Sequence, residues 1–333
     1  NEYAGNVVAT TNMHDGYGRM FAEWKQKVGN KFNYSFGSYL SYVWIMQGDK
    51  NMYKTILYPK ASASYSISDK SNIRLSVERS YSIPSLGDLS NVDQIIDSLQ
   101  IRRGNPDLKV SHTWQGNLNY EWRSKLFTLN ASLFYMNQRN PVMEETYIEN
   151  NKFIRTNINQ VSWQKVNPEL QLQAGPFFDI VSFNIIGGMN YFDSHGINYR
   201  HYYTNWYYNA SMTMQYKRLS ATAEVKNHKN EFYGETCTYQ ESYTILNADY
   251  KFSNDLKVGL IVLNPFQDRN RYNLPTNNYN RYAPSRQSMH IKESAKMFAV
   301  TFVWNFSFGR KYEGVQKQLN NSDRDSGTMK NGK

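Results

Sequence analysis

Apolar and polar side chains alternate along much of the chain with a period of two residues. Every even-numbered position of the segment 206–216 is apolar or aromatic, and the odd-numbered positions from 209 to 215 are polar. The segments 32–46 and 298–308 largely repeat this pattern. Alternation with this period is typical of β-strands that have one apolar and one polar face. Because the runs exceed the roughly five or six residues of an average globular strand, we predict unusually long strands.

Counting such segments gives about thirteen strands. No helical pattern of useful length competes with them, apart from one short turn around Val92 to Leu99, so the chain is expected to be nearly all β. The predicted strands span 19–28, 31–46, 55–67, 72–83, 111–123, 126–148, 152–174, 178–192, 200–216, 219–228, 238–252, 256–266 and 294–308.

Short and long connections alternate between these segments. Tight turns are expected at 29–30, 68–71, 123–125, 175–177, 217–218 and 253–255, and longer loops at 47–54, 84–110, 193–199, 229–237 and 267–293. This order is typical of outer-membrane barrels, which have short periplasmic turns and long outer loops. The segments 126–148 and 152–174 keep this order if they form one long hairpin that rises above the membrane. We therefore predict an all-β, transmembrane, antiparallel up-and-down barrel in the bacterial outer membrane.

The strand length fits a lipid bilayer. Ten residues at about 3.3 Å each, tilted by roughly 40°, span about 25 Å, which is the height of the apolar band on such barrels. A soluble β-sandwich or propeller is the alternative, but its strands should be shorter. The side chains that we expect to face lipid are Trp206, Tyr208, Met212, Met214, Phe298, Phe302, Trp304 and Phe306.

The strand count is odd, whereas single-chain bacterial barrels have an even number of antiparallel strands. Thirteen strands should therefore not close alone, and we expect residues 1–308 to be the carboxy-terminal portion of a larger barrel. Residues 309–333 are polar and are predicted to form a disordered periplasmic tail.

Two stretches carry a resemblance to a known family. The first is Arg103-Gly104-Asn105-Pro106-Asp107-Leu108, followed by the alternating runs 114–122 and 127–135. The second is the ending Val303-Trp304-Asn305-Phe306-Ser307-Phe308 with the basic residues after it. From about residue 19 to 312 the chain resembles the late barrel of TonB-dependent outer-membrane receptors, and most of all their outer-membrane β-barrel branch, which is related to the SusC-like transporters.

This resemblance implies a barrel of 22 strands that an amino-terminal plug fills and an inner-membrane TonB complex energises. It also implies capture of a small-molecule, glycan or peptide ligand at the outer loops, with a surface lipoprotein as a further partner. The sequence departs from the family in two ways. No plug or TonB box is visible, and Lys109-Val110-Ser111-His112 stands where relatives often carry Pro-Glu.

The formal net charge of +10 raises the alternative of a nucleic-acid partner. Arginine and tyrosine interleave between Arg269 and Arg286, but no nucleic-acid-binding motif accompanies them, so we expect no such partner. In a barrel this segment is an outer loop, as is 84–110. The candidate ligand-binding residues of the two loops are Arg102, Arg103, Asp107, Arg269, Arg271, Tyr279 and Arg281.

Catalytic and metal-binding patterns are weak. The single cysteine, Cys237, has no CxxC partner, and the six histidines do not match a zinc spacing. We therefore expect no cofactor, no metal site and no enzyme. A barrel-wall hydrolase that uses Ser111 and His112 is one alternative function, although no carboxylate partner is apparent. A self-contained diffusion porin is the other. The mean hydropathy of −0.71 and the lack of an apolar run near 18 residues exclude a spanning helix.

Overall fold

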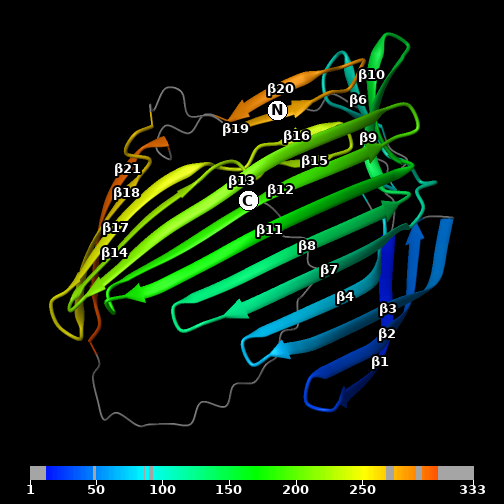
Figure 1. Cartoon of the computed structure of the whole chain (residues 1–333). Helices are drawn as coiled ribbons and strands as arrows, with labels where there is room; N and C mark the ends of the chain where they lie inside the picture. Colours follow the sequence, from blue (N-terminus) through cyan, green and yellow to red (C-terminus); the bar gives the residue numbers. More distant parts are fainter. Residues whose placement is uncertain are drawn as a thin grey trace.

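The computed structural model describes residues 13–47, 50–85, 87–89, 93–267, 274–289 and 295–306, and its main feature is one curved sheet of thirteen strands (Figure 1). Each strand pairs with the next along the sheet in antiparallel fashion. In order across the sheet they are β1 (Met13–Val28), β2 (Phe32–Gln47), β3 (Lys50–Ser68), β4 (Ser71–Ser82), β7 (Ser111–Arg123), β8 (Phe127–Arg139), β11 (Ser162–Phe177), β12 (Val181–His195), β13 (Arg200–Tyr216), β14 (Leu219–Lys226), β17 (Tyr243–Lys251), β18 (Leu256–Leu263) and β21 (Met297–Trp304). The predicted thirteen-stranded, up-and-down arrangement is confirmed.

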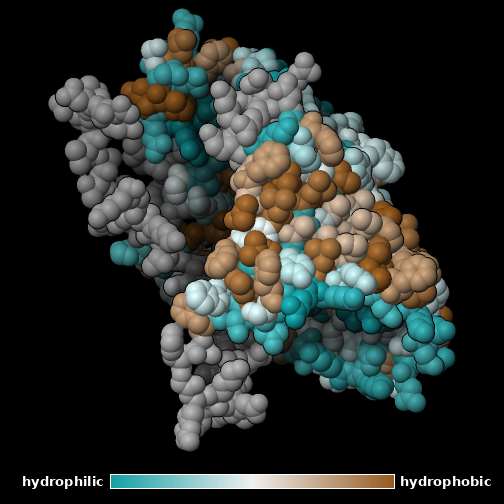
Figure 2. All heavy atoms as spheres, turned by 90° about the vertical axis from the view of Figure 1, so that its left-hand side faces the viewer, coloured by the Kyte–Doolittle hydropathy of each residue, from teal (hydrophilic) through white to brown (hydrophobic). Residues whose placement is uncertain are grey.

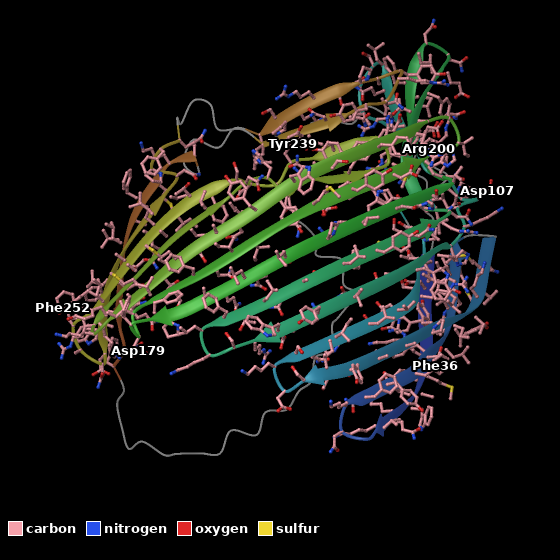
Figure 3. All side chains as sticks on the ribbon, viewed as in Figure 1. Phe36, Asp107, Asp179, Arg200, Tyr239 and Phe252 are labelled. Atoms are coloured by element: carbon pink, nitrogen blue, oxygen red, sulfur yellow. The ribbon has the colours of Figure 1, made fainter. Side chains whose placement is uncertain are left out.

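The connections differ between the two ends of the sheet. Figure 3 labels Asp179 and Phe252 at the end with short turns, and Asp107 and Arg200 at the opposite end. At that second end, here called the mouth, the longer connections form two four-stranded sheets. The first contains β5 (Gln94–Ile95), β6 (Gln100–Arg103), β10 (Lys152–Asn159) and β9 (Val142–Glu149). The second contains β15 (Glu231–Tyr233), β16 (Thr236–Thr238), β19 (Leu274–Asn278) and β20 (Ser285–Met289).

Two of the predicted long loops are shorter in the structure. Strands β2 and β3 stay paired as far as Gln47 and Lys50, and β12 and β13 stay paired as far as His195 and Arg200. Polar residues in both places predict a loop, but backbone hydrogen bonds of the ladder do not depend on side-chain polarity and continue there. The turn expected over 92–99 contains, in its described part, strand β5.

The long hairpin predicted from 126–148 and 152–174 has the expected pairing but is not continuous. Strand β8 pairs with β11 as far as Arg139 and Ser162, and β9 pairs with β10 from Val142 onwards. Between them Asn140 has a positive φ of 51° and is followed by Pro141, which has no N–H for the ladder. The hairpin therefore leaves the large sheet at this point, and its tip joins the first mouth sheet.

The two faces of the large sheet follow the alternation of the sequence. Apolar side chains gather over the outer face, with a hydrophilic rim at the turn end (Figure 2). On this face Trp206 is 70% exposed, Phe302 64% and Met212 42%, whereas Met214 is only half-exposed. An exposed apolar face of this extent indicates an apolar neighbour rather than water.

Among the described residues the sheet has two open edges, because β1 and β21 do not pair with each other or with a further strand. Since successive strands reverse direction, the first and thirteenth strands run the same way. Among the described residues, no helix is long and apolar enough to cross a membrane. Residues Arg269, Arg271, Phe308 and the predicted tail 309–333 lie outside the described part of the chain.

Substituting one residue on each face of β13 tests the predicted lipid face. We expect Met212→Arg to lower the free energy of unfolding in lipid vesicles by about 2–4 kcal/mol, because it places a charge in hydrocarbon. Ser211→Arg should cost much less, since Ser211 lies on the opposite face with Asn184 and Glu224 as its cross-strand neighbours. Urea titrations of both variants measure the difference, and the reverse order would contradict the assignment of the faces.

Candidate ligand-binding site

The inner face of the sheet is polar, and its side chains form contacts that reach across a strand. The Asn167 amide on β11 donates a hydrogen bond to the Tyr207 hydroxyl on β13 at 2.7 Å. Tyr207 in turn donates to Glu169 at 2.7 Å. The concave side of a curved sheet brings side chains two strands apart close enough for such bonds. Gly188 of β12 lies in register between Glu169 and Tyr207, and the absence of a side chain there lets the Tyr207 ring cross the strand.

A segment that follows β14, residues 229–238, folds onto this inner face and is here called the inner segment. Three of its first residues bind the wall with polar or charged groups. These contacts are Lys229 Nζ to Glu169 (3.3 Å), Asn230 Nδ2 to the Tyr203 hydroxyl (2.7 Å) and Lys165 Nζ to Glu231 (2.6 Å). The inner segment is therefore fixed to β11 and β13 rather than loose above the lumen.

Apolar packing strengthens this attachment. Phe232 is 2% exposed, its ring stacks on Tyr203 at 5.4 Å, and its carbonyl accepts a hydrogen bond from Trp163 Nε1 at 2.8 Å. Phe192 and Cys237 are fully buried in the same cluster. Burial raises the pKa of the Cys237 thiol. Trp163 and Phe192, which are aromatic residues on an otherwise polar face, thus form the surface on which the inner segment packs.

The connection between β4 and β7 docks on the inner face in the same manner. Val43, Ile45 and Ile56 of β2 and β3 are buried on the face that is otherwise polar. They pack against Leu89, Leu108 and Val110 of the connection and its end. Two long connections therefore cover opposite parts of the mouth.

Glu235 links three elements of the mouth. Its carboxylate is 6% exposed, accepts a hydrogen bond from Asn280 Nδ2 at 2.6 Å, and lies 3.4 Å from His201 Nε2. Its backbone carbonyl accepts a bond from the Tyr279 N–H at 2.8 Å. The inner segment is thereby joined to the chain after β19 and to barrel strand β13.

The structure gives the predicted ligand-binding residues different surroundings. Arg103 is bound by its own chain, through ion pairs with Asp93 at 3.0 Å and Glu149 at 2.9 Å. These carboxylates raise the pKa of the Arg103 guanidinium further above its usual range. Arg102 and Asp107 are exposed, and Arg102 lines a cavity.

The other predicted group is only partly described, because Arg269 and Arg271 lie outside the described residues. The Tyr279 ring lies 6.0 Å from Phe232, and the Arg281 guanidinium lies 4.4 Å from the Tyr282 ring centre. Tyr279 and Arg281 do not line the cavity, of about 190 Å³, to which Arg102 contributes.

Several polar or mixed cavities lie among the described residues of the lumen and mouth. One of about 190 Å³ contains Arg102 and Arg155, and one of about 260 Å³ contains Arg19 and Tyr58. A third of about 390 Å³ lies between the mouth sheets. The fourth, of about 410 Å³, lies on the inner wall of β4, β7, β8 and β11, where its lining is entirely polar or charged.

Sequence reasoning missed Arg155, Glu144 and Arg19 as cavity residues. Arg155 lies directly opposite Arg102 on paired strands β10 and β6, and its Nε and Nη2 donate to the Glu144 carboxylate at 3.1 and 2.8 Å. No local motif reports this parallel pairing between residues about fifty positions apart. Arg19 was detectable, because it interrupts a run of aromatic positions on one strand face.

The arrangement offers binding groups but no catalytic constellation at Ser111 and His112. The two residues are adjacent on β7, so their side chains project from opposite faces of the strand. Ser111 Oγ accepts a hydrogen bond from Gln138 at 3.0 Å and donates to the Ser82 carbonyl. Within the described ranges, no group of three or more His, Cys, Asp or Glu side chains could hold a metal ion.

A curved, up-and-down sheet with an apolar outer face, a polar inner wall and connections gathered at one end defines an outer-membrane β-barrel. The comparison with protein families agrees, since the model of the outer membrane protein β-barrel family matches residues 16–304. The chain belongs to this family, and the bacterial outer membrane is its location.

Solved structures with a similar fold include transporters and receptors. The copper transporter OprC has a TM-score of 0.64 at 9% identity, and the match covers 89% of this chain and 48% of OprC. The siderophore receptor PirA from Acinetobacter baumannii has a TM-score of 0.61 at 11% identity, covering 88% and 46%. The FrpB iron transporter from Neisseria meningitidis has a TM-score of 0.59 at 11% identity, covering 89% and 46%. The chain thus spans about half the length of these proteins.

A search of the curated proteins found no match.

The close approach at Gly188 gives a stability prediction. A Cβ atom there would lie 2.4 Å from the Tyr207 hydroxyl and 2.9 Å from the Pro168 carbonyl oxygen. Gly188→Ala should therefore displace Tyr207 from Asn167 and Glu169, and lower the free energy of unfolding by about 1–3 kcal/mol. Gly187→Ala is the matched control, because nothing lies within 4 Å of its Cβ position. Equal stability of the two variants in urea unfolding would contradict the proposed crossing of β12.

Labelling of Cys237 measures how firmly the inner segment is attached. Because Cys237 is fully buried and its thiol pKa is raised, N-ethylmaleimide should label the native protein slowly at pH 8. Phe232→Ala removes a buried ring from the attachment and should speed labelling by about tenfold or more. Phe252→Ala at the turn end should leave the rate unchanged. Rapid labelling of the native protein would show that the inner segment is not docked as described.

Proposed function

We propose that the chain forms part of a TonB-dependent outer-membrane receptor, which binds a ligand at its mouth and lumen for energy-coupled import. The observation that carries this proposal is the sheet of thirteen strands with two open edges, whose fold matches about half of each transporter described above. The mouth sheets, the polar inner wall and the cavities supply surfaces for capture of a small-molecule, glycan or peptide ligand.

The open edges support a larger barrel. In hydrocarbon, unpaired backbone N–H and C=O groups cost several kcal/mol each, so barrels close and leave no edge. Strands β1 and β21 run in the same direction, and antiparallel closure between them requires an odd number of further strands. A barrel of 22 strands meets this condition, with the thirteen described strands at its carboxy-terminal end. The SusC-like relationship proposed from the sequence agrees with such a barrel.

The outer face supports a lipid contact. We infer that the exposed rings and aliphatic side chains on the outer face form the apolar belt of the barrel, since no other apolar partner covers them among the described residues. The belt includes Trp206, Tyr208, Met212, Met214, Phe298, Phe302 and Trp304, with Phe306 just beyond β21.

The partners follow from this assignment. A plug domain would meet the polar inner wall, and the TonB complex would act on that plug from the periplasm. A surface lipoprotein would meet the mouth, where the two small sheets project. These partners are proposals that rest on the family resemblance.

A diffusion porin is the competing function, and the docked connections argue against it. The inner segment and the connection before β7 both occupy the mouth and are fixed by buried apolar clusters. An open channel would be narrowed by both.

Conductance in planar lipid bilayers tests the proposed function. The complete protein purified from outer membranes should give no steady ion conductance, because a plugged receptor blocks the lumen. A general diffusion porin measured in the same bilayers serves as the control and should give discrete open steps. Steady open steps from this protein would contradict the receptor proposal and favour the porin.

A further inference from the structure

The polar inner face carries a second group of rings, on β1, β2 and β3, and three of them remain exposed among the residues that the structure describes. Tyr17 is 58% exposed, Phe21 49% and Tyr39 38%. The register places them on one face, because Phe21 is opposite Tyr39 and Tyr39 is opposite Tyr58. The wall rings Trp163 and Phe192 are buried under the inner segment, whereas Tyr17, Phe21 and Tyr39 remain exposed.

Arg19 stands at the centre of these rings. Its guanidinium carbon lies 5.5 Å from the ring centre of Tyr17, 5.7 Å from Tyr39 and 5.8 Å from Tyr58. Among the described residues, no carboxylate pairs with Arg19 and no acceptor takes a hydrogen bond from it. The exposed guanidinium of Arg19, which carries five N–H donors, is therefore free to bind a ligand beside these rings.

This group opens into a cavity of about 260 Å³ that Tyr17, Arg19 and Tyr58 line together with Ser41 and Asp15. Ser85 also lines this cavity and the neighbouring cavity of about 190 Å³ that contains Arg102. The two cavities therefore adjoin at Ser85. Arg102 likewise forms no ion pair with a described residue, whereas its neighbour Arg155 is bound to Glu144.

We propose that the Arg19 cavity binds the anionic group of a ligand that also carries a flat aromatic ring, and that Arg102 attracts the same anion from the adjoining cavity at the mouth. This assignment deepens the proposed function, on which it rests, by naming the ligand class. A guanidinium binds carboxylate or phosphate through two parallel hydrogen bonds, and the ring faces around it stack on a flat partner. The surplus of basic residues in the chain favours an anion in the same way.

A neutral ligand would use this cavity less well. A neutral sugar or amide could stack on the rings, but it would leave the charge of Arg19 without a counter-ion. Asp15 lines the cavity as its only acidic residue, four positions from Arg19 along β1. The rings therefore favour a flat aromatic group, and the Arg19 cation favours an anion. A ligand that carries both satisfies the two features together.

A matched pair of probes tests the proposal. Calorimetric titration of the complete protein, purified in detergent from outer membranes, compares 2-naphthoate with the neutral isostere 2-naphthamide. We expect 2-naphthoate to bind at least about tenfold more tightly, because a charge-assisted hydrogen bond contributes that much or more. Arg19→Gln should reduce the affinity for 2-naphthoate to that for the amide, and Arg102→Gln should reduce it less.

Two further variants control for structure. Arg19→Lys keeps the charge but loses the paired donors, and should give an intermediate affinity. Arg218→Gln changes an arginine at the turn end and should leave both affinities unchanged. Equal affinity for the two probes, no binding of 2-naphthoate, or an Arg19→Gln variant with full affinity would overturn the proposal. Because conductance tests the receptor separately, a closed lumen with any of these results would mean that only the ligand class is wrong.

Discussion

The structure depends on the requirement that backbone hydrogen bonds be satisfied where no water is available. One continuous antiparallel sheet meets it, because each strand supplies the donors and acceptors of the next. At the mouth the ladder also continues as far as Gln47 and Lys50, where the polar sequence alone predicts a loop, because pairing satisfies backbone groups whatever side chains they carry. At Asn140 and Pro141 the hairpin leaves the large sheet, because the positive φ of Asn140 turns the chain out of the ladder and Pro141 offers no N–H to continue it.

Once the backbone is satisfied, the side chains of each face follow their surroundings. The outer face exposes Trp206 and Phe302, and the inner face forms amide, hydroxyl and carboxylate contacts that cross strands. The contact between Tyr207 and Glu169 requires a glycine at position 188, because a side chain there would block the Tyr207 ring. Such contacts hold neighbouring strands at a fixed curvature, and they give the docked connections a rigid surface.

Sequence predicted the large sheet well and the mouth poorly, for a physical reason. The strands at 111–123 and 200–216 have the predicted bounds because alternation is a local property of each strand. The mouth sheets depend on pairing between distant segments, such as β6 with β10, which no local period reports. Arg103 illustrates the result: its motif indicated a ligand residue, but Glu149, far along the chain, binds it. Arg102 was chosen by the same reasoning and does line a cavity.

Departures from the alternation contain the information about the mouth. Val43, Ile45 and Trp163 are apolar residues on a polar face, and each is buried beneath a connection. A ring on the inner wall therefore indicates something that covers it. Tyr17 and Phe21 are also rings on the inner face, but no connection covers them among the described residues. Because Arg19 lies between them, a group that covers these rings must also pair with its charge. An apolar connection would leave that charge unpaired in a poorly hydrated site, whereas an anion with a ring satisfies both the guanidinium and the rings.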